Sequence, residues 1–297
     1  FLNYRFFEKY VKNCRGFATA KASVVGTLKK PIILGEVNLY KDTVTVSFLN
    51  TTYHINSLSA KLDEHGFNFG NFTIYDIRDS SIYGSGRINH ESFKQFALDL
   101  KVTTPNGQFI NTTEKESPGF YGVAYGKGNV TFSGPISSPI IKAYALTKPG
   151  TYCKLPINSS YEINRYGFYK FVDHEPKTSA AIINPSLKLN GVNFTLEIDA
   201  TPDARMDIVL DPTAGDVLTT YGRGNLKIKI TKNGNTTMYG TYEIERGSYL
   251  FTLQNIVNKR FEINKGSSIN FTGEVSKATL NVNALYEVRL AFSAGMT

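Results

Sequence analysis

Tryptophan is absent from this 297-residue chain, and methionine and cysteine are scarce, at three and two residues. The two cysteines, Cys14 and Cys153, lie far apart and fit neither a CxxC motif nor the ligand spacing of a zinc site. They are compatible with one long-range disulfide or with two unpaired thiols. The sequence leaves both possibilities open.

Long apolar runs and basic blocks are also missing. Because no stretch of 18 apolar residues occurs, we expect no membrane-spanning helix. The chain opens without Met or a signal peptide, so we interpret it as a fragment of a longer protein. The net charge is +8, but the basic residues are scattered. At 226–232 they alternate with apolar residues, as on the solvent-exposed face of a strand. Because they form no basic block, we expect no nucleic-acid partner.

Catalytic and metal-binding patterns are missing as well. None of the four histidines has a metal-ligand neighbour at the usual spacing, and neither HExxH nor GxSxG occurs. We therefore expect no enzyme, no cofactor and no metal site. Aspartates cluster over 199–216 and could supply oxygen ligands for calcium, although their spacing does not fit an EF-hand loop.

Alternation of apolar and polar residues is the dominant pattern, and it predicts an all-β fold. The alternating runs are rich in β-branched and aromatic residues, and Gly, Asn, Asp and Pro separate them. The segment 232–235, KNGN, predicts a hairpin turn. The one helix candidate is 89–100, where apolar residues recur at helical spacing. The runs cover 43–48, 194–199, 226–231, 249–254, 261–264, 268–273 and 279–286.

Two internal repeats indicate a stacked β array. Segment 26–33 matches 134–141 in the spacing of Gly, Pro and Ile, and Tyr-Gly-x-Gly occurs at 83–86, 125–128 and 221–224. In such an array glycine permits a bend or a close approach of neighbouring strands. No helix and no Gly-Lys-Ser/Thr ending follows any copy, so we do not expect a phosphate-binding loop.

The last third of the chain resembles the C-terminal conserved region of the TamB family. The resemblance rests on GRGNL at 222–226, GTYEIERGSYLFTL at 240–253, KRFEINKGSSINFTG at 259–273 and ATLNVNALY at 278–286. Segments within 1–190 resemble the preceding repeats more loosely. One departure is Glu274-Val275, where the family usually has an acidic residue followed by Pro. The composition, rich in Tyr, Phe, Asn and Lys, resembles that of family members from Bacteroidetes.

This resemblance implies a β-taco, an elongated sheet folded into an open groove with an apolar inner face. We expect one elongated module over 1–297, with a looser repeat-like part at 1–190 and the signature at 191–297. The family implies a periplasmic location in a Gram-negative cell envelope and an inner-membrane anchor that is absent here. It also implies phospholipid transport between the two membranes, and outer-membrane protein assembly and secretion with a TamA/BamA-type barrel partner.

The alternating rows supply the groove candidates, because rows stacked in register form a continuous apolar stripe. Burying about 15 methylenes of an acyl chain releases roughly 12 kcal/mol of free energy relative to water. Because groove and membrane are similarly apolar, the free energy of transfer from one to the other is near zero. Alternation alone also fits a filled β-sandwich core, such as a surface domain that binds glycan or calcium. A scaffold that binds unfolded outer-membrane strands is a further alternative. The candidates are Leu226, Ile228, Ile230, Tyr249, Phe251, Leu253, Phe261, Ile263, Ile269, Phe271, Leu280 and Val282.

Overall fold

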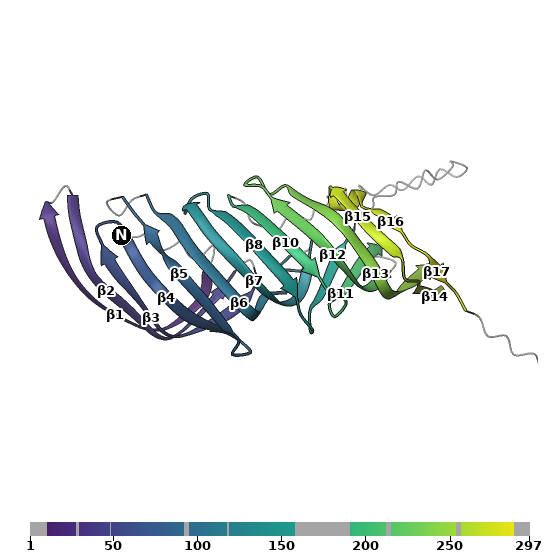
Figure 1. Ribbon diagram of the computed structural model, residues 1–297, viewed down its shortest axis with the longest axis horizontal. Coiled ribbons are helices and arrows are strands. Elements are labelled where there is room, and N and C mark those ends of the chain that lie inside the picture. The colour runs from purple at the N-terminus through teal and green to yellow at the C-terminus, as the bar shows by residue number, and fades with distance from the viewer. Residues whose placement is uncertain are drawn as a thin grey trace, which may run out of the picture.

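The computed structural model is almost entirely β-structure and is elongated, with its strands running across the long axis (Figure 1). It describes residues 11–27, 30–47, 49–91, 95–117, 119–157, 191–211, 215–253 and 257–287. In these ranges the only helical element is a 3-10 turn, Val275–Lys277. Nothing among them forms a helix that is both long and apolar enough to cross a membrane.

The strands follow one another along the long axis from the N-terminal to the C-terminal end. They are β1 (Val11–Thr27), β2 (Lys30–Val46), β3 (Thr51–Asp63), β4 (Gly66–Asp76), β5 (Ser81–Asn89), β6 (Ala97–Thr112), β7 (Tyr121–Pro135), β8 (Ile140–Thr147), β9 (Tyr152–Pro156), β10 (Asn193–Ala200), β11 (Arg205–Asp211), β12 (Asp216–Ile230), β13 (Thr236–Leu253), β14 (Val257–Ile263), β15 (Ser267–Gly273), β16 (Thr279–Asn281) and β17 (Ala284–Leu285).

Neighbouring strands pair antiparallel from β1 to β7, and four later rows consist of two short strands in line. In one of these rows β8 and β9 both pair with β7, and in the next β10 and β11 both pair with β12. In the last two rows β14 and β15 both pair with β13, and β16 and β17 pair in turn with β15 and β14. The sheet therefore continues as one layer through the interrupted rows.

Among the strands that the structure describes, the one parallel junction lies between the β8–β9 row and the β10–β11 row. With this junction, the pairings run in a closed cycle, β7–β8–β10–β12–β11–β9 and back to β7. The cycle surrounds only the breaks at residues 148–151, between β8 and β9, and at residues 201–204, between β10 and β11. Hydrogen bonds bridge these breaks, from the Thr201 amide to Thr147 Oγ1 at 2.8 Å and from the Arg205 amide to the Thr151 carbonyl at 3.0 Å. The cycle is therefore a feature of two broken strands within a continuous sheet.

The Tyr-Gly-x-Gly repeats lie inside β5, β7 and β12. Their glycines allow the close approach of neighbouring backbones that we expected. A Cβ added at Gly222 would lie 2.0 Å from the Glu243 carbonyl oxygen, and one added at Gly86, where φ is +136°, would lie 2.1 Å from the Asp99 oxygen. Neither position accepts a side chain without backbone movement.

Local predictions had mixed outcomes. The turn at 232–235 is confirmed, since β12 and β13 form a hairpin there with Gly234 at φ +84°. No helix spans 89–100, because Asn89 ends β5 and residues 97–100 begin β6; residues 92–94 lie outside the described part. His90 and Phe96 instead meet edge to face, 5.8 Å apart. Both cysteines are unpaired, and burial raises the pKa of the Cys153 thiol to about 12.

Candidate functional groove

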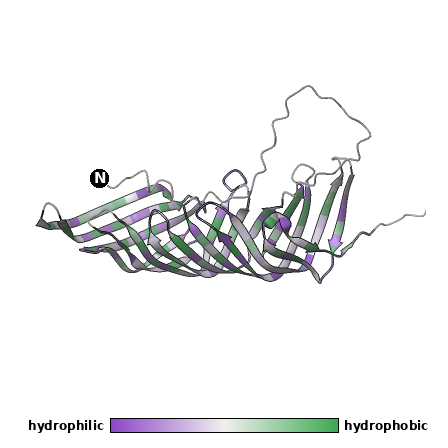
Figure 2. Cartoon of the chain, turned by 90° about the horizontal axis from the view of Figure 1, so that it is seen from above, coloured by the Kyte–Doolittle hydropathy of each residue, from purple (hydrophilic) through white to green (hydrophobic). Residues whose placement is uncertain are grey.

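Apolar side chains occupy one face of the sheet along the length of the described structure, and we call this the concave face. Register defines it, because residues paired directly across an antiparallel ladder share a face. The ribbon alternates between hydrophobic and hydrophilic residues, as Figure 2 shows. One row of partners runs Leu100, Phe132, Ile141, Phe194 and Ile230, and a second runs Ala22, Gly35, Leu62, Phe67, Ile88 and Leu98.

Burial of this face is lowest on β1 and most complete around β11 to β15, although single residues between them, such as Ile82 and Ile141, are also buried. Along β1, Ala18 to Val24 are exposed, and Val24 is 67% exposed. In the middle strands Leu100 and Phe132 are half-buried. At the other end Ile269 is 0% exposed. The middle of the concave face therefore offers apolar surface that the chain's own side chains leave partly uncovered.

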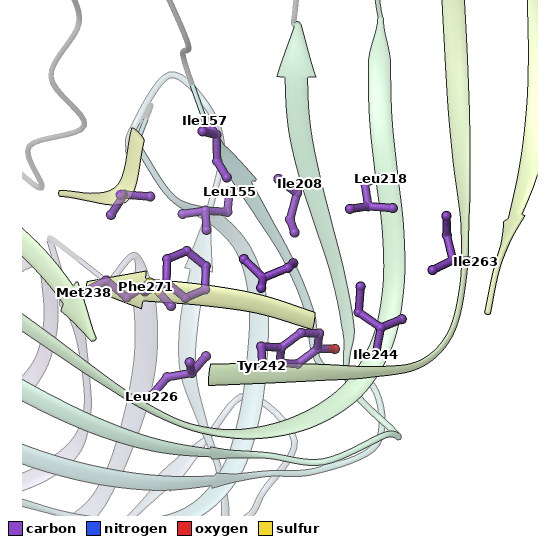
Figure 3. Close-up of a cluster of buried hydrophobic side chains, with 12 residues drawn as sticks. Leu155, Ile157, Ile208, Leu218, Leu226, Met238, Tyr242, Ile244, Ile263 and Phe271 are labelled. Carbon is purple, nitrogen blue, oxygen red and sulfur yellow. The ribbon is translucent and has the colours of Figure 1, made fainter. Parts of the chain in front are cut away.

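The C-terminal end of the groove is filled by twelve buried side chains, which we call the terminal core. They come from strands on both sides of the fold, as Figure 3 shows, with Ile208 and Leu155 on one side and Phe271 on another. This end is a packed interior rather than open surface. The members are Leu155, Ile157, Ile208, Leu218, Leu226, Met238, Tyr242, Ile244, Ile263, Ile269, Phe271 and Val275.

The groove residues proposed from sequence lie on or beside the terminal core. Leu226, Ile263, Ile269 and Phe271 belong to it, and Ile228, Tyr249, Leu280 and Val282 pack against it. Ile230 is buried in a second cluster with Ile141 and Val192. Phe251 and Phe261 are half-buried, and Tyr249 lies 6.3 Å from the first ring and 6.1 Å from the second. The side chain of Leu253 lies outside the described part.

Tyr249 is anchored as well as packed. Its hydroxyl donates to Asp216 Oδ2 at 3.3 Å, and the Thr252 amide donates to the other oxygen at 2.6 Å. Burial, followed by the nearby Asp216 carboxylate, raises the pKa of Tyr249 to about 12. The phenol therefore stays neutral and fixes its ring on the concave face.

Sequence reasoning missed the rows in the N-terminal half. These include Val37 and Ala60, which pair across β2 and β3, and Leu98, Leu100 and Val102 on β6. The signal was present as alternation in the segments 18–24, 33–39 and 97–102. Alanine and glycine weaken it in β1 and β2, and the helix expected over 89–100 concealed the start of β6.

The opposite, convex face carries polar and charged side chains that pair with one another. Lys227 Nζ lies 2.7 Å from Glu197 Oε1, and the Arg246 guanidinium lies 3.7 Å from the centre of the Tyr221 ring. Such contacts keep this face hydrated while the apolar rows turn inward. The convex face therefore carries paired polar side chains, together with exposed apolar ones such as Leu34 and Ile140.

Three of the aspartates at 199–216, namely Asp199, Asp207 and Asp216, accept hydrogen bonds from protein donors. Asp199 accepts from the Tyr144 hydroxyl at 2.5 Å and from Asn225 Nδ2 at 2.6 Å. Both oxygens of the buried Asp207 accept from Arg205 at 2.8 Å. Within the described ranges no three His, Cys, Asp or Glu side chains gather as a metal site. These three carboxylates are therefore engaged with donors from the protein itself.

Comparison with known proteins agrees with this architecture. A family model described as the TamB C-terminal domain matches residues 71–296, well over half of the chain. No curated protein and no solved structure matches it. Members of the family belong to a translocation and assembly module of the cell envelope, act with a TamA-type partner and are not known as enzymes. The chain therefore belongs to the TamB family and has a TamB-like role in that module.

Proposed function

We propose that the concave face carries phospholipid through the periplasm between the inner and outer membranes, in support of outer-membrane protein assembly with a TamA/BamA-type barrel. One observation carries this proposal: the concave rows are apolar across many strands, and half-buried side chains such as Leu100 and Phe132 lie among buried ones in their middle part. Acyl chains would cover this surface while the headgroups stay at the hydrated rim. We also propose that an anchor of the kind the family implies links the groove to the inner membrane.

The contact region that we propose lies mainly before the terminal core. A side chain such as Ile269, at 0% exposure, has no surface to offer an acyl chain. Leu100, Phe132 and Leu196 are half-buried and lie on the same face. Among the residues proposed from sequence, Ile228, Phe251 and Phe261 remain candidates for lipid contact, and the fully buried ones are candidates for packing.

The energetics suit a conduit. Each buried methylene contributes about 0.8 kcal/mol relative to water, in the groove as in a bilayer. Movement from one row to the next therefore exchanges equivalent environments. A row of similar half-buried positions allows passage without a deep trap, whereas an enclosed pocket would retain the lipid.

Site-specific photo-crosslinking tests this proposal. A photoreactive amino acid at Leu100 on the concave face should capture phospholipid from vesicles of phosphatidylethanolamine and phosphatidylglycerol. The same probe at Ser133, on the convex face of β7, and at the buried Ile269 should capture little. If Leu100 and Ser133 label equally, the proposed groove is wrong.

Strand addition is a second candidate function, and the edge of the sheet favours it. Among the described residues β1 pairs only with β2, and its side chains Phe17 and Val24 are 71% and 67% exposed. An exposed strand edge is a template for a further strand. Binding of an unfolded outer-membrane strand would then protect β1 amides from hydrogen exchange, whereas lipid would leave them unchanged.

A further inference from the structure

β3 and β4 separate in the middle and rejoin in the same register. Their partners are Tyr53 with Asp76 and His54 with Tyr75 at one end, and Lys61 with Asn68, Leu62 with Phe67 and Asp63 with Gly66 at the other. Residues 55–60 and 69–74 do not pair with each other, although all of them are described. Each strand stays paired on its other side, with β2 or with β5. We call this interruption the lateral opening.

The pairing fails because, in each strand, the alternation of side chains between the two faces shifts by one residue. The shift occurs at a different position along the opening in β3 than in β4. β5 alternates regularly, so Ile82 and Ile88 share the concave face with their partners Ile74 and Phe67. Ile74 and Phe67 are an odd number of positions apart, so regular alternation would place them on opposite faces. The register shift at Phe69 adds one residue and brings both side chains to the concave face. On β3 the change lies near Asn56. Leu58 pairs with Leu39 on the concave side, whereas Tyr53 pairs with Asp76, which shares the concave side with Ile74.

By register, Asn56 lies opposite Thr73, whereas Phe69 lies opposite Ala60. Between these levels, opposite residues point to opposite faces: Leu58 points inward while Asn71 points outward. Residues on opposite faces cannot form an antiparallel ladder. The lateral opening is therefore built into the two strands and does not depend on a loop.

A hollow of about 780 Å³ lies at the lateral opening, within the size range of ligand sites. Leu58, Phe69 and Phe72 contribute apolar lining, and the convex-face residues Tyr83, Ser85 and Lys101 contribute polar lining. The Phe72 ring leans over β5, because a Cβ added at Gly84 would lie 2.1 Å from its Cζ atom. Glycine at position 84 thus lets the ring turn toward β5 and away from β3.

We propose that the lateral opening is a passage for phospholipid, with the acyl chain between β3 and β4 and the headgroup on the convex face. The proposal rests on the proposed lipid function and adds a second way into the groove. The lining has the polarity of the ligand, apolar on the concave side and polar with one cation on the convex side. The Lys101 ammonium supplies the charge that a lipid phosphate requires.

A peptide strand fits this opening less well. Six unpaired residues span about 20 Å, and paired residues close the opening at both ends. An added strand would have to thread its length through a closed slot before it could pair. An acyl chain enters by its tip and leaves its headgroup outside.

Photo-crosslinking from the convex face tests the passage. A photoreactive residue at Ser85 should capture ³²P-labelled phosphatidylglycerol from vesicles, whereas the same residue at Ser133, also on the convex face, should not. Asn71→Trp, which places an indole at the exposed rim, should abolish capture at Ser85 and preserve capture at Leu100. Ser133→Trp is the matched control and should change neither. Lys101→Ala should reduce Ser85 capture about fivefold.

The outcomes separate this passage from the groove itself. Capture at Leu100 without capture at Ser85 overturns the passage and leaves the proposed function intact. Capture at neither position counts against both. Equal capture at Ser85 and Ser133 means contact with the vesicle surface only, and a protein adduct at Ser85 means a strand or partner site; each result overturns the passage. Thermal melting of the Asn71→Trp variant verifies that it is folded.

Discussion

Phe271 on β15 is one of the largest fully buried side chains, with 2% of its surface exposed in the terminal core. Phe271→Ala should lower the free energy of unfolding by about 3–5 kcal/mol, because it removes buried apolar surface and leaves a cavity. Phe17→Ala is the matched control, since the Phe17 ring is 71% exposed on β1. We expect the control to shift stability by no more than about 0.5 kcal/mol. Urea unfolding of both variants measures the difference, and similar losses would contradict a packed terminal core.

Asp63 at the β3–β4 turn makes stability depend on pH. Burial alone would raise its pKa, but hydrogen bonds from the His65 and Gly66 amides, at 2.8 and 3.0 Å, and the Arg87 guanidinium at 2.9 Å lower the pKa of Asp63 below its ordinary value. A lowered folded-state pKa stabilises the fold above the unfolded-state value of about 3.9, and this contribution is lost as the pH falls through the folded-state pKa.

The variant Asp63→Asn should therefore be less stable than the wild type at neutral pH. The difference should shrink toward zero once the pH falls below the folded-state pKa of Asp63, where both states of the wild type bind the proton. Urea midpoints at the two pH values measure it. A difference that persists unchanged in acid would assign the effect to the amide's geometry instead of to the carboxylate charge.

At the scale of the strand, glycine determines how closely β12 approaches β13. Gly222→Ala should destabilise the protein by about 1–3 kcal/mol, because the new Cβ would lie 2.0 Å from the Glu243 carbonyl oxygen. Gly266→Ala is the control: Gly266 has φ +94°, but no atom lies within 4 Å of the added Cβ. The control measures backbone strain without a clash. If thermal unfolding shows the control to be the more damaging change, close approach is not what Gly222 provides.

Alternation predicted the strands because it reflects a sheet with one apolar and one polar face. It could not predict where that face is covered, since Leu100 in the half-buried groove and Ile269 in the terminal core have the same local pattern. That difference depends on the strands opposite, such as β9 and β11, which are far away in sequence. The sequence could not predict the lateral opening either, because the opening depends on which face the opposite side chains of two neighbouring strands point to. The helix expected over 89–100 failed because its apolar residues serve a turn and a strand.

On the scale of the whole molecule, the two ends of the groove differ in packing: side chains fill the C-terminal end and are exposed at the N-terminal end. The terminal core joins strands from both sides of the groove at the C-terminal end, whereas β1 exposes nearly all of its side chains. A lipid carrier needs apolar surface that its own side chains leave partly free, and this surface contributes little to stability while it is empty. The terminal core supplies stability where the groove does not, so the gradient separates binding surface from folding core.

This gradient predicts how amide hydrogen exchange varies along the chain. Amides in β12, β13 and β15 should exchange most slowly, because opening them requires disruption of the terminal core. Amides in β1 should exchange fastest, since few buried contacts oppose their opening. Adding phosphatidylglycerol vesicles should slow exchange in the middle strands β5 to β7 and leave the terminal core unchanged, because a core that is already buried has no surface for lipid. Exchange measured by mass spectrometry with and without vesicles distinguishes the two regions. Uniform protection along the chain would contradict the gradient, and lipid-induced slowing confined to β12–β15 would move the binding surface into the region that we assign to packing.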